Sequence, residues 1–332
     1  MPTEPATATA TRARALDLRK LSTRGQDLLG QNGPLVALVL LGVVIAVLSP
    51  VFLSTQNLLN VGIQASVVAI LAFGQTFVIV SAGIDLSVGS VAALAGIVTG
   101  YSASMQGVNP VLAIGLGLAT GVAAGLVSGS LVAFGKLPAF IATMAMLSIA
   151  RGLSLVLSKG VPVAQPPAVA WFGRTIGGWL PIPVVIMVIL GLLASFILNR
   201  TYVGRAMYAI GGNEEAARLS GINVRRQQLI VYALSGLFAS IAGLVLAGRL
   251  ASGQPQAAAG YELDAIAAVV IGGASLAGGS GRAFGTFIGA LVLAVIRNGL
   301  NLLNVSSFWQ QVVIGAVIAL AVLTDTLRRR RT

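Results

Sequence analysis

The chain contains no cysteine and no histidine in its 332 residues. Thiolate chemistry, disulfide bonds, imidazole proton relays and metal sites built from these two residues are therefore excluded. Charged residues are also scarce, at 9% of the chain, whereas hydrophobic residues make up 56%. Apolar runs of 18 or more residues recur, which is typical of helices that cross a lipid bilayer. We therefore expect an all-α, polytopic membrane protein without a metal site.

Apolar stretches bounded by charged residues, proline and glycine predict about ten membrane spans. They cover residues 34–53, 57–81, 86–106, 109–134, 138–158, 181–199, 227–248, 263–279, 284–302 and 309–327. Glycine-rich segments at 81–90 and 272–285 interrupt two pairs of spans, so a broken or re-entrant helix is the alternative to two full crossings there.

The chain divides into three parts. Residues 1–33 are polar and are expected to form a disordered cytoplasmic tail. Residues 34–327 form the predicted transmembrane domain, with one long charged loop at 200–226, and residues 328–332 form a basic cytoplasmic end.

The net charge of +12 would indicate a nucleic-acid partner in a soluble chain, but its distribution indicates membrane topology instead. With an even number of spans and a cytoplasmic start, 16 of the 21 basic residues fall on the cytoplasmic side. Cytoplasmic loops of membrane proteins collect lysine and arginine in this way. We therefore expect a multi-pass protein surrounded by lipid, with both termini in the cytoplasm and no nucleic-acid partner.

Four glycines in the span 109–134 recur every fourth residue, which leaves one face of the helix without side chains. They are Gly117, Gly121, Gly125 and Gly129. Such a face suits packing within the chain or a contact between subunits, and we favour packing within the chain.

The dipeptide Gly135-Lys136 resembles the end of a phosphate-binding loop. However, Gly129 lies one residue too far away, and Leu137 replaces the hydroxyl residue that would hold magnesium. We therefore predict no ATP site, no catalytic residue and no cofactor in this chain.

One carboxylate, Asp85, lies inside an otherwise uncharged region, in the sequence Gly83–Ser90. A charge in the bilayer costs roughly 2.5–3.5 kcal/mol on insertion scales, so it normally faces protein or a wet cavity. Asp85 is therefore a candidate for a pore-lining or gating residue. The alternative is a helix N-cap, in which the carboxylate accepts bonds from free backbone N–H groups.

Further polar residues extend this candidate set. The segment Gly273–Ser280 repeats the glycine, leucine and serine positions of Gly83–Ser90, with Ser275 in place of Asp85. Paired segments of this kind mark translocation routes in transporters, although chance similarity is an equal alternative. Asn298 and Asn301 are three residues apart and could line an external vestibule or form a wet helix end. The candidate translocation-path residues are Gln75, Asp85, Ser87, Ser275, Asn298 and Asn301.

The loop 200–226 carries a short predicted helix. Asn213 is a good N-cap, Glu214 and Glu215 occupy the first turn, and Arg218 is placed for an ion pair with Glu214. Gly221 supplies the stop. About seven residues are too few for an isolated helix, so either a groove in another protein or the chain's own loops must hold it.

The external loop at 158–180 is rich in aromatic, proline and basic residues. It contains Lys159, Pro162, Pro166, Pro167, Trp171, Phe172, Arg174 and Trp179. These side chains could form an interfacial belt with rigid turns. The alternative is a docking surface for a soluble partner.

Several blocks of the sequence resemble a known family. The residues Glu215–Gly221 fit the E-A-A-x-x-x-G core of the cytoplasmic loop of ATP-binding cassette (ABC) importer permeases. Together with GQTFVIVSAGIDLSVGSVAALAG, GKLPAFIATMAMLSIARG and VVIGGASLAGGSGRAFGT, this loop resembles permeases of the ribose, xylose and galactose type. The likeness runs from about residue 57 to 327, although the I-x-L-P ending of the wider loop motif is absent after Gly221.

This resemblance implies a type II-like importer permease that works as a pair, most simply a homodimer, in a bacterial cytoplasmic membrane. It implies cytoplasmic ATPase subunits, which would bind the ATP, and an external sugar-binding protein. The chain itself would be no enzyme and would carry a monosaccharide such as a pentose or hexose. The ATPase-coupling residues would be Asn213, Glu214, Glu215, Ala216, Ala217, Arg218 and Gly221.

Other solutes remain open, namely nucleosides, inositol and autoinducer-type sugars. A secondary transporter is a further alternative, but proton coupling would normally need several membrane carboxylates or histidines, and Asp85 is nearly alone. A scaffold protein would not need an exposed helix with an acidic start.

Overall fold

The computed structural model describes residues 33–329, and this part of the chain is almost entirely helical. The predicted tail, apart from Gly33, and residues 330–332 lie outside the described residues. Within residues 33–329, seven helices are long and apolar enough to cross a membrane. They are α3 (Thr55–Val80), α4 (Val88–Gly100) with the π-helical turn η1 (Tyr101–Met105), α5 (Pro110–Ala133), α6 (Ala139–Ser158), α8 (Ile182–Arg200), α11 (Val224–Leu250) and α13 (Ala283–Leu302).

The remaining elements are shorter or less apolar. Two apolar helices, α2 (Gly33–Leu48) and α14 (Ser307–Arg329), lie at the two ends of the described chain. Between the spans lie α7 (Pro167–Ala170), the 3-10 turn η2 (Trp171–Gly173), α9 (Tyr202–Gly212), α10 (Glu214–Leu219) and α12 (Tyr261–Ile271). The strand β1 (Val163–Ala164) pairs antiparallel with β4 (Ser252–Gly253), and β2 (Thr175–Ile176) pairs antiparallel with β3 (Leu180–Pro181).

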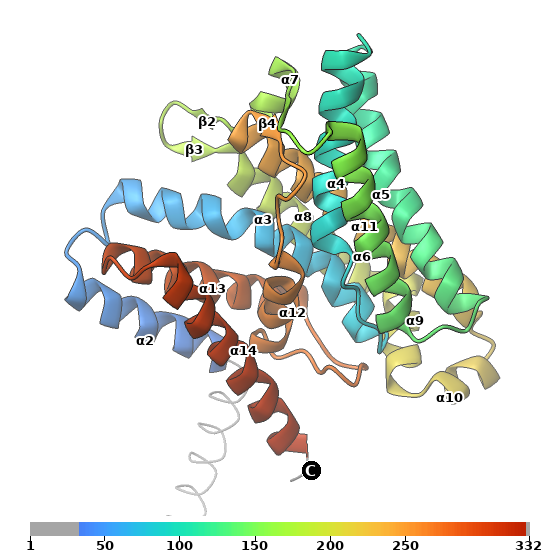
Figure 1. Ribbon diagram of the computed structural model, residues 1–332. Helices are drawn as coiled ribbons and strands as arrows, with labels where there is room; N and C mark the ends of the chain where they lie inside the picture. The colour runs from blue at the N-terminus through green and yellow to red at the C-terminus, as the bar shows by residue number, and fades with distance from the viewer. Residues whose placement is uncertain (1–32, 330–332) are drawn as a thin grey trace, which may run out of the picture.

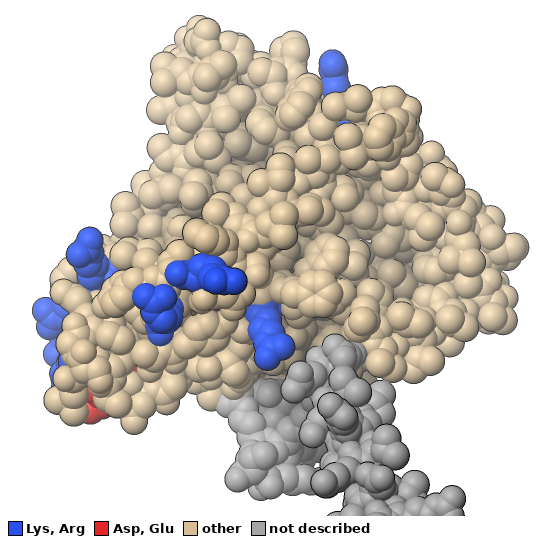
Figure 2. Space-filling view, turned by 180° about the vertical axis from the view of Figure 1, so that it is seen from behind, with Lys and Arg blue, Asp and Glu red and all other residues tan. Residues whose placement is uncertain are grey.

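The two ends of the bundle differ in charge. Figure 1 shows α10 and the carboxyl end of α14 on the lower side, and α7 with the short strands on the upper side. On the face drawn in Figure 2, basic side chains gather toward one end, and a wide band without charge separates them from a single basic side chain at the other end. A bilayer requires a belt without charge between two polar ends. The end that carries more basic side chains is the cytoplasmic one.

Helix α3 is the centre of the bundle. Every residue from 65 to 80 is buried, and α4, α8, α11, α12 and α13 all contact this helix. A helix that is apolar on all sides has no solvent face and belongs in a core. Its buried threonine, Thr76, shares a hydrogen bond with Thr286 of α13 at 2.8 Å between the two hydroxyl oxygens. The spans of the two halves of the chain are therefore packed around one shared helix.

Glycine brings α5 and α11 into close contact. A side chain at Gly121 would overlap the backbone of Gly236, and one at Gly125 would overlap the backbone of Tyr232. Gly117 lies in the same way against α4, and Gly129 against Leu229 and Tyr232. The predicted glycine face therefore serves packing within the chain, as expected, and both helices approach at backbone distance.

Nine of the predicted spans correspond to helices whose ends differ by a few residues from the prediction. The tenth prediction, a full crossing at 263–279, is wrong, and the structure shows the alternative of a helix broken at the glycine-rich segment. The helix α12 ends at Ile271, and its 11 residues extend only about 16 Å at 1.5 Å per residue, against a hydrocarbon core of about 30 Å. Residues 272–282 continue without regular structure.

Glycine is the physical reason why α12 stops. Gly273, Gly278 and Gly279 have positive φ angles of 89°, 90° and 72°, which are accessible to glycine at little cost. The segment 272–282 then reaches the end of α3, where the Gly279 N–H donates to the carbonyl of Val80 at 2.9 Å. Within this segment only Ala274 is buried, and the other residues are half-buried or exposed. The short helix and this segment together return the chain to the side of α10, so the predicted even topology is preserved.

The α5–α11 contact predicts a difference between two glycines of the same helix. We expect Gly125→Val to lower the midpoint of thermal unfolding in detergent, because overpacking a close contact costs about 1–3 kcal/mol. Gly115→Val is the matched control, since nothing lies within 4 Å of a side chain at Gly115. Equal midpoints for the two variants would show that the contact does not limit stability.

Candidate functional site

The cytoplasmic loop folds as two consecutive helices, α9 and α10. The side chain of Asn213 accepts a hydrogen bond from the N–H of Ala216 at 2.9 Å, and Gly221 has a φ of 84°. The predicted N-cap and stop are therefore confirmed. The helix α9 was not predicted from the sequence, because its 11 residues form only a short apolar stretch beside the much longer membrane spans.

The ion pair within α10 differs from the prediction. Arg218 binds Glu215 at 2.6 Å and not Glu214, because residues three apart are neighbours on a helix as much as residues four apart. This contact also raises the pKa of the Arg218 guanidinium above its usual value. Both side chains are about 65% exposed, so the pair contributes little to folding stability.

A small apolar cluster holds α10 against the rest of the chain. Ala217 is buried and packs with Ile210 of α9 and Val224 of α11. On the outer surface, Glu214, Glu215 and Ala216 are exposed, and Leu219 has an exposed fraction of 79%. The chain's own loops therefore hold the helix, and its other face, which is both acidic and apolar, is open to a partner.

Glycine connects α9 directly to the interior. A side chain at Gly211 would overlap the carbonyl of Val80, at the end of α3, and the N–H of Gly279, in the segment after α12. The neighbouring Gly212 has nothing within 4 Å. We call the contact of Gly211, Val80 and Gly279 the glycine junction. It joins the helix next to α10 to both interrupted parts of the membrane domain.

Asp85 is the centre of a buried polar network. One of its carboxylate oxygens accepts from the N–H of Ser87 at 2.9 Å and from the hydroxyl of Ser87 at 2.6 Å, and the other accepts from the hydroxyl of Ser235 at 2.8 Å. The amide of Gln75 faces the backbone N–H and C=O of Asp85 at 3.1 Å, in the orientation that satisfies both groups. Gln75, Asp85 and Ser87 are all buried, so this network lies within protein and stabilises the turn that precedes α4.

The other three candidate residues for the translocation path, Ser275, Asn298 and Asn301, lie apart from the Asp85 network. Ser275 is half-buried in the turn after α12, where its backbone pairs with Ser280 and Gly278. The segment Gly273–Ser280, which repeats part of the sequence Gly83–Ser90, therefore does not form a network like that of Asp85. Asn298 is buried and exchanges two hydrogen bonds with Asn57 of α3, at 2.8 and 3.0 Å. Asn301 is exposed and lines a cavity, where its side chain accepts from Gln310 at 2.7 Å.

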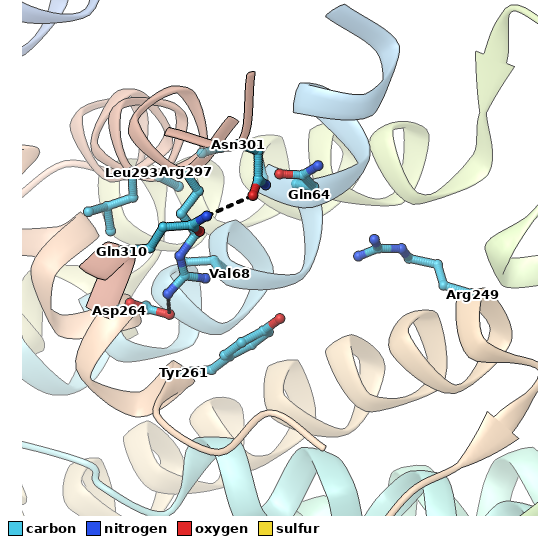
Figure 3. Close-up of a pocket in the computed structure, with 12 residues that line it drawn as sticks. Gln64, Val68, Arg249, Tyr261, Asp264, Leu293, Arg297, Asn301 and Gln310 are labelled. Atoms are coloured by element: carbon cyan, nitrogen blue, oxygen red, sulfur yellow. Dashed lines mark hydrogen bonds and ion pairs between the residues drawn. The ribbon is translucent and has the colours of Figure 1, made fainter. Parts of the chain in front are cut away.

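This cavity has a volume of about 200 Å³ and lies between α3, α11, α12, α13 and α14. Its polar lining residues are Gln64, Arg249, Tyr261, Asp264, Arg297, Asn301 and Gln310. Figure 3 shows Arg297 and Asp264 on one side, joined as an ion pair of 2.6 Å, and Arg249 pointing in from the other side. We call this space the polar cavity.

Most of the polar cavity was missed at the level of sequence. The signal was present, because Asp264, Arg297 and Arg249 are charges at the ends of apolar segments, where charge is rare. The sequence could not show that Asp264 and Arg297 face each other, since this depends on how α12 and α13 pack.

The chain is similar to known membrane transport proteins. A family model described as "Branched-chain amino acid transport system / permease component" matches residues 57–322. The ribose import permease protein RbsC of Escherichia coli strain K12 is 50% identical over 302 residues, which cover 89% of this chain and 93% of that protein. The protein of the same name from Bacillus subtilis strain 168 is 47% identical, over 88% of this chain and 92% of its own length.

A relative with another substrate in its name is also similar. The D-allose transport system permease protein AlsC of Escherichia coli strain K12 is 40% identical, over 87% of this chain and 90% of that protein. No solved structure matches the chain.

The Asp85 network predicts unequal effects of two substitutions. We expect Asp85→Ala to reduce both the yield of folded protein and solute uptake, because it removes the acceptor of three buried hydrogen bonds, and an unsatisfied buried donor costs about 1–3 kcal/mol. Ser275→Ala keeps the backbone turn and should leave both quantities near wild type. Thermal stability in detergent and uptake by vesicles measure the difference, and two small, equal effects would contradict it.

Proposed function

This chain belongs to the family of branched-chain amino acid transport system permease components, and on this basis we propose that it is the membrane-spanning permease subunit of an ATP-binding cassette importer for a monosaccharide. The likeness to ribose and allose permeases along nearly the whole chain carries this conclusion. The protein is a multi-pass component of the bacterial inner membrane, in keeping with its apolar helices.

In this proposal the chain supplies the path and partner subunits supply the energy. ATP is bound and hydrolysed by cytoplasmic ATPase subunits, and α10 is the surface that they contact. The support is geometric, because α10 lies at the basic end of the bundle and exposes Leu219 and two glutamates. A short helix with one apolar exposed side chain suits a groove in a partner.

The glycine junction gives this contact a route to the membrane domain. Movement of α10 would carry α9 with it, because both helices share the apolar cluster of Ile210, Ala217 and Val224. At Gly211 the backbone of α9 lies directly against the ends of α3 and of the segment after α12. With no side chain between them, these backbones cannot move independently by much.

The opposite end of the bundle is proposed to receive the solute from an external sugar-binding protein. There the loop between α6 and α8 packs on α11, since a side chain at Gly173 would overlap the backbone of Gly248. Trp171 and Trp179 remain exposed, at 45% and 67%. We propose that this loop is the docking surface, and that two copies of the chain assemble in the lipid bilayer as a homodimer.

Uptake by the assembled importer tests the solute. Proteoliposomes that contain the permease and its ATPase, supplied with the binding protein, should accumulate a monosaccharide only when ATP is present on the side of the membrane that carries the ATPase. Nucleosides, inositol, autoinducer-type sugars and a branched-chain amino acid are the comparison solutes. Preferential uptake of one of these, or uptake driven by a proton gradient without ATP, would contradict the proposal.

The proposed role of α10 predicts the effect of charge reversal. Glu215→Lys should abolish uptake while expression and membrane insertion stay normal, because Glu215 is exposed and carries no packing role. Gly221→Pro should be harsher, since proline fixes φ near −65° and Gly221 requires 84°. Co-purification with the ATPase measures the contact directly.

A double variant separates the partner contact from the helix's own ion pair. Glu215→Lys combined with Arg218→Glu restores an ion pair within α10 but presents the partner with reversed charge. We expect this variant to remain inactive. Recovery of uptake and of ATPase association would show that the single variant had failed only because it lost the ion pair within α10. This result would contradict the proposed coupling role of Glu215.

A further inference from the structure

We propose that an apolar pocket between α3, α8 and α13 binds an acyl chain of one anionic phospholipid from the cytoplasmic leaflet, and that Arg282 binds the phosphate of this lipid. We call this space the lipid pocket. It shares no lining residue with the polar cavity. The inference goes beyond the proposed function and does not depend on which solute the chain carries.

The lining of the lipid pocket suits hydrocarbon. It comes from Phe73 of α3, from one face of α8 between Met187 and Ser195, and from the first residues of α13, and Ser195 is its one polar side chain. The volume is about 240 Å³. An apolar cavity of about 150 Å³ stays dry and binds benzene, so the lipid pocket is large enough for a segment of an acyl chain.

Glycine forms the floor of the lipid pocket, and exposed apolar side chains form its rim. A side chain at Gly191 would lie 2.9 Å from the ring of Phe73, so α8 leaves a recess in front of that ring. At the rim, Val188, Leu192 and Phe284 have exposed fractions of 46%, 68% and 65%. Large apolar side chains on the outside of a membrane domain face lipid, so the lipid pocket opens toward the bilayer.

The lipid pocket lies at the depth of the cytoplasmic leaflet. Phe73 is seven residues before Val80, the cytoplasmic end of α3, which corresponds to about 10 Å along the helix. Ser195 is five residues before Arg200, the cytoplasmic end of α8, or about 8 Å. Since α13 begins on the same side, the lower end of the lipid pocket lies close to the headgroups of this leaflet.

A basic side chain follows directly at this lower end. Arg282 precedes the lining residue Ala283, is exposed, and has no hydrogen-bond or ion-pair partner for its side chain within the described residues. The residue before it is held in place, because the hydroxyl of Tyr208 in α9 donates to the carbonyl of Gly281 at 2.7 Å. A guanidinium binds phosphate through two parallel N–H donors, so Arg282 offers an anchored phosphate contact.

A second polar group lies between this arginine and the apolar recess. The side-chain amide of Asn199 donates to the hydroxyl oxygen of Ser195 at 3.1 Å, and the proton of that hydroxyl has no acceptor among the described residues. It can donate to an ester carbonyl. From the cytoplasm inward, the chain therefore presents a cation, a hydroxyl donor and an apolar recess, which is the order of phosphate, ester and hydrocarbon in a phospholipid.

The charge at the lipid pocket favours an anionic headgroup over a zwitterionic one. No aspartate or glutamate is among the lining residues, so the ammonium group of a zwitterionic lipid would find no partner there. A basic side chain near the membrane surface attracts anionic lipid. The occupant that fits is therefore a phospholipid with a net negative charge, such as phosphatidylglycerol.

Photolabelling of the full chain tests the headgroup preference. The protein is placed in phosphatidylcholine vesicles with a trace of a lipid that carries a photoreactive group in its acyl chain, either phosphatidylglycerol or phosphatidylcholine. Labelled peptides of α8 and α13 are identified by mass spectrometry. We expect Arg282→Gln to lower labelling by the phosphatidylglycerol probe about fivefold, equivalent to about 1 kcal/mol, and to leave labelling by the phosphatidylcholine probe unchanged. Arg282→Lys should keep most of the labelling.

Arg225→Gln is the matched control, because Arg225 is an exposed arginine at the cytoplasmic start of α11, lies over the ring of Phe134, and does not line the lipid pocket. An equal decrease in Arg225→Gln and Arg282→Gln would show only a diffuse attraction by the basic end. Equal labelling of the wild type by both probes would show no headgroup preference. Absence of labelling in α8 and α13 would show that a second copy or another protein covers this face. Each of these results would overturn the proposal.

Filling the lipid pocket tests where the acyl chain lies. Ser195→Phe should abolish labelling of the lining peptides by both probes, because the larger side chain occupies the recess. Leu193→Phe is the matched control, an exposed residue of the same helix outside the lining, and should be labelled like the wild type. Thermal unfolding in detergent checks that both variants are folded. Unchanged labelling in folded Ser195→Phe would overturn the proposal, since the lipid would then lie outside the pocket.

Discussion

The packing of the cytoplasmic loop against the membrane domain depends on one steric constraint, the absence of a side chain at Gly211. Only because this residue is glycine can the end of α9 contact the backbone of Val80 and Gly279 together. These two residues end α3, the most buried helix, and belong to the irregular segment after α12. The charged cytoplasmic loop is therefore packed onto the two places where the membrane domain departs from continuous helices.

A second constraint is the low polarity of the interior, which forces polar groups to find partners. Asp85 is satisfied by two serines, and Asn298 is paired reciprocally with Asn57. Asp264 and Arg297 neutralise each other.

How much the sequence predicts depends on whether the signal is local. The caps of α10 follow from Asn213 and Gly221 themselves, and most span positions follow from apolar runs between charges. The glycine-rich segment 272–285 indicated a possible interruption, but the end of α12 at Ile271 could not be placed, because the φ angles of the glycines that follow are set by packing. Asn298 is buried and Asn301 is exposed because of the rotation of α13 against α3 and α14, and no local sequence pattern encodes this rotation.

Substitution of two adjacent glycines in the assembled importer measures most directly whether the glycine junction couples the cytoplasmic helices to the membrane domain. Gly211→Val should separate α9 from α3 and from the segment after α12, so ATP hydrolysis would continue while sugar uptake is lost. Gly212→Val, which has open space around it, should transport at nearly the wild-type rate. Full uptake in Gly211→Val with normal thermal stability would contradict the claim that this contact couples the cytoplasmic helices to the membrane domain.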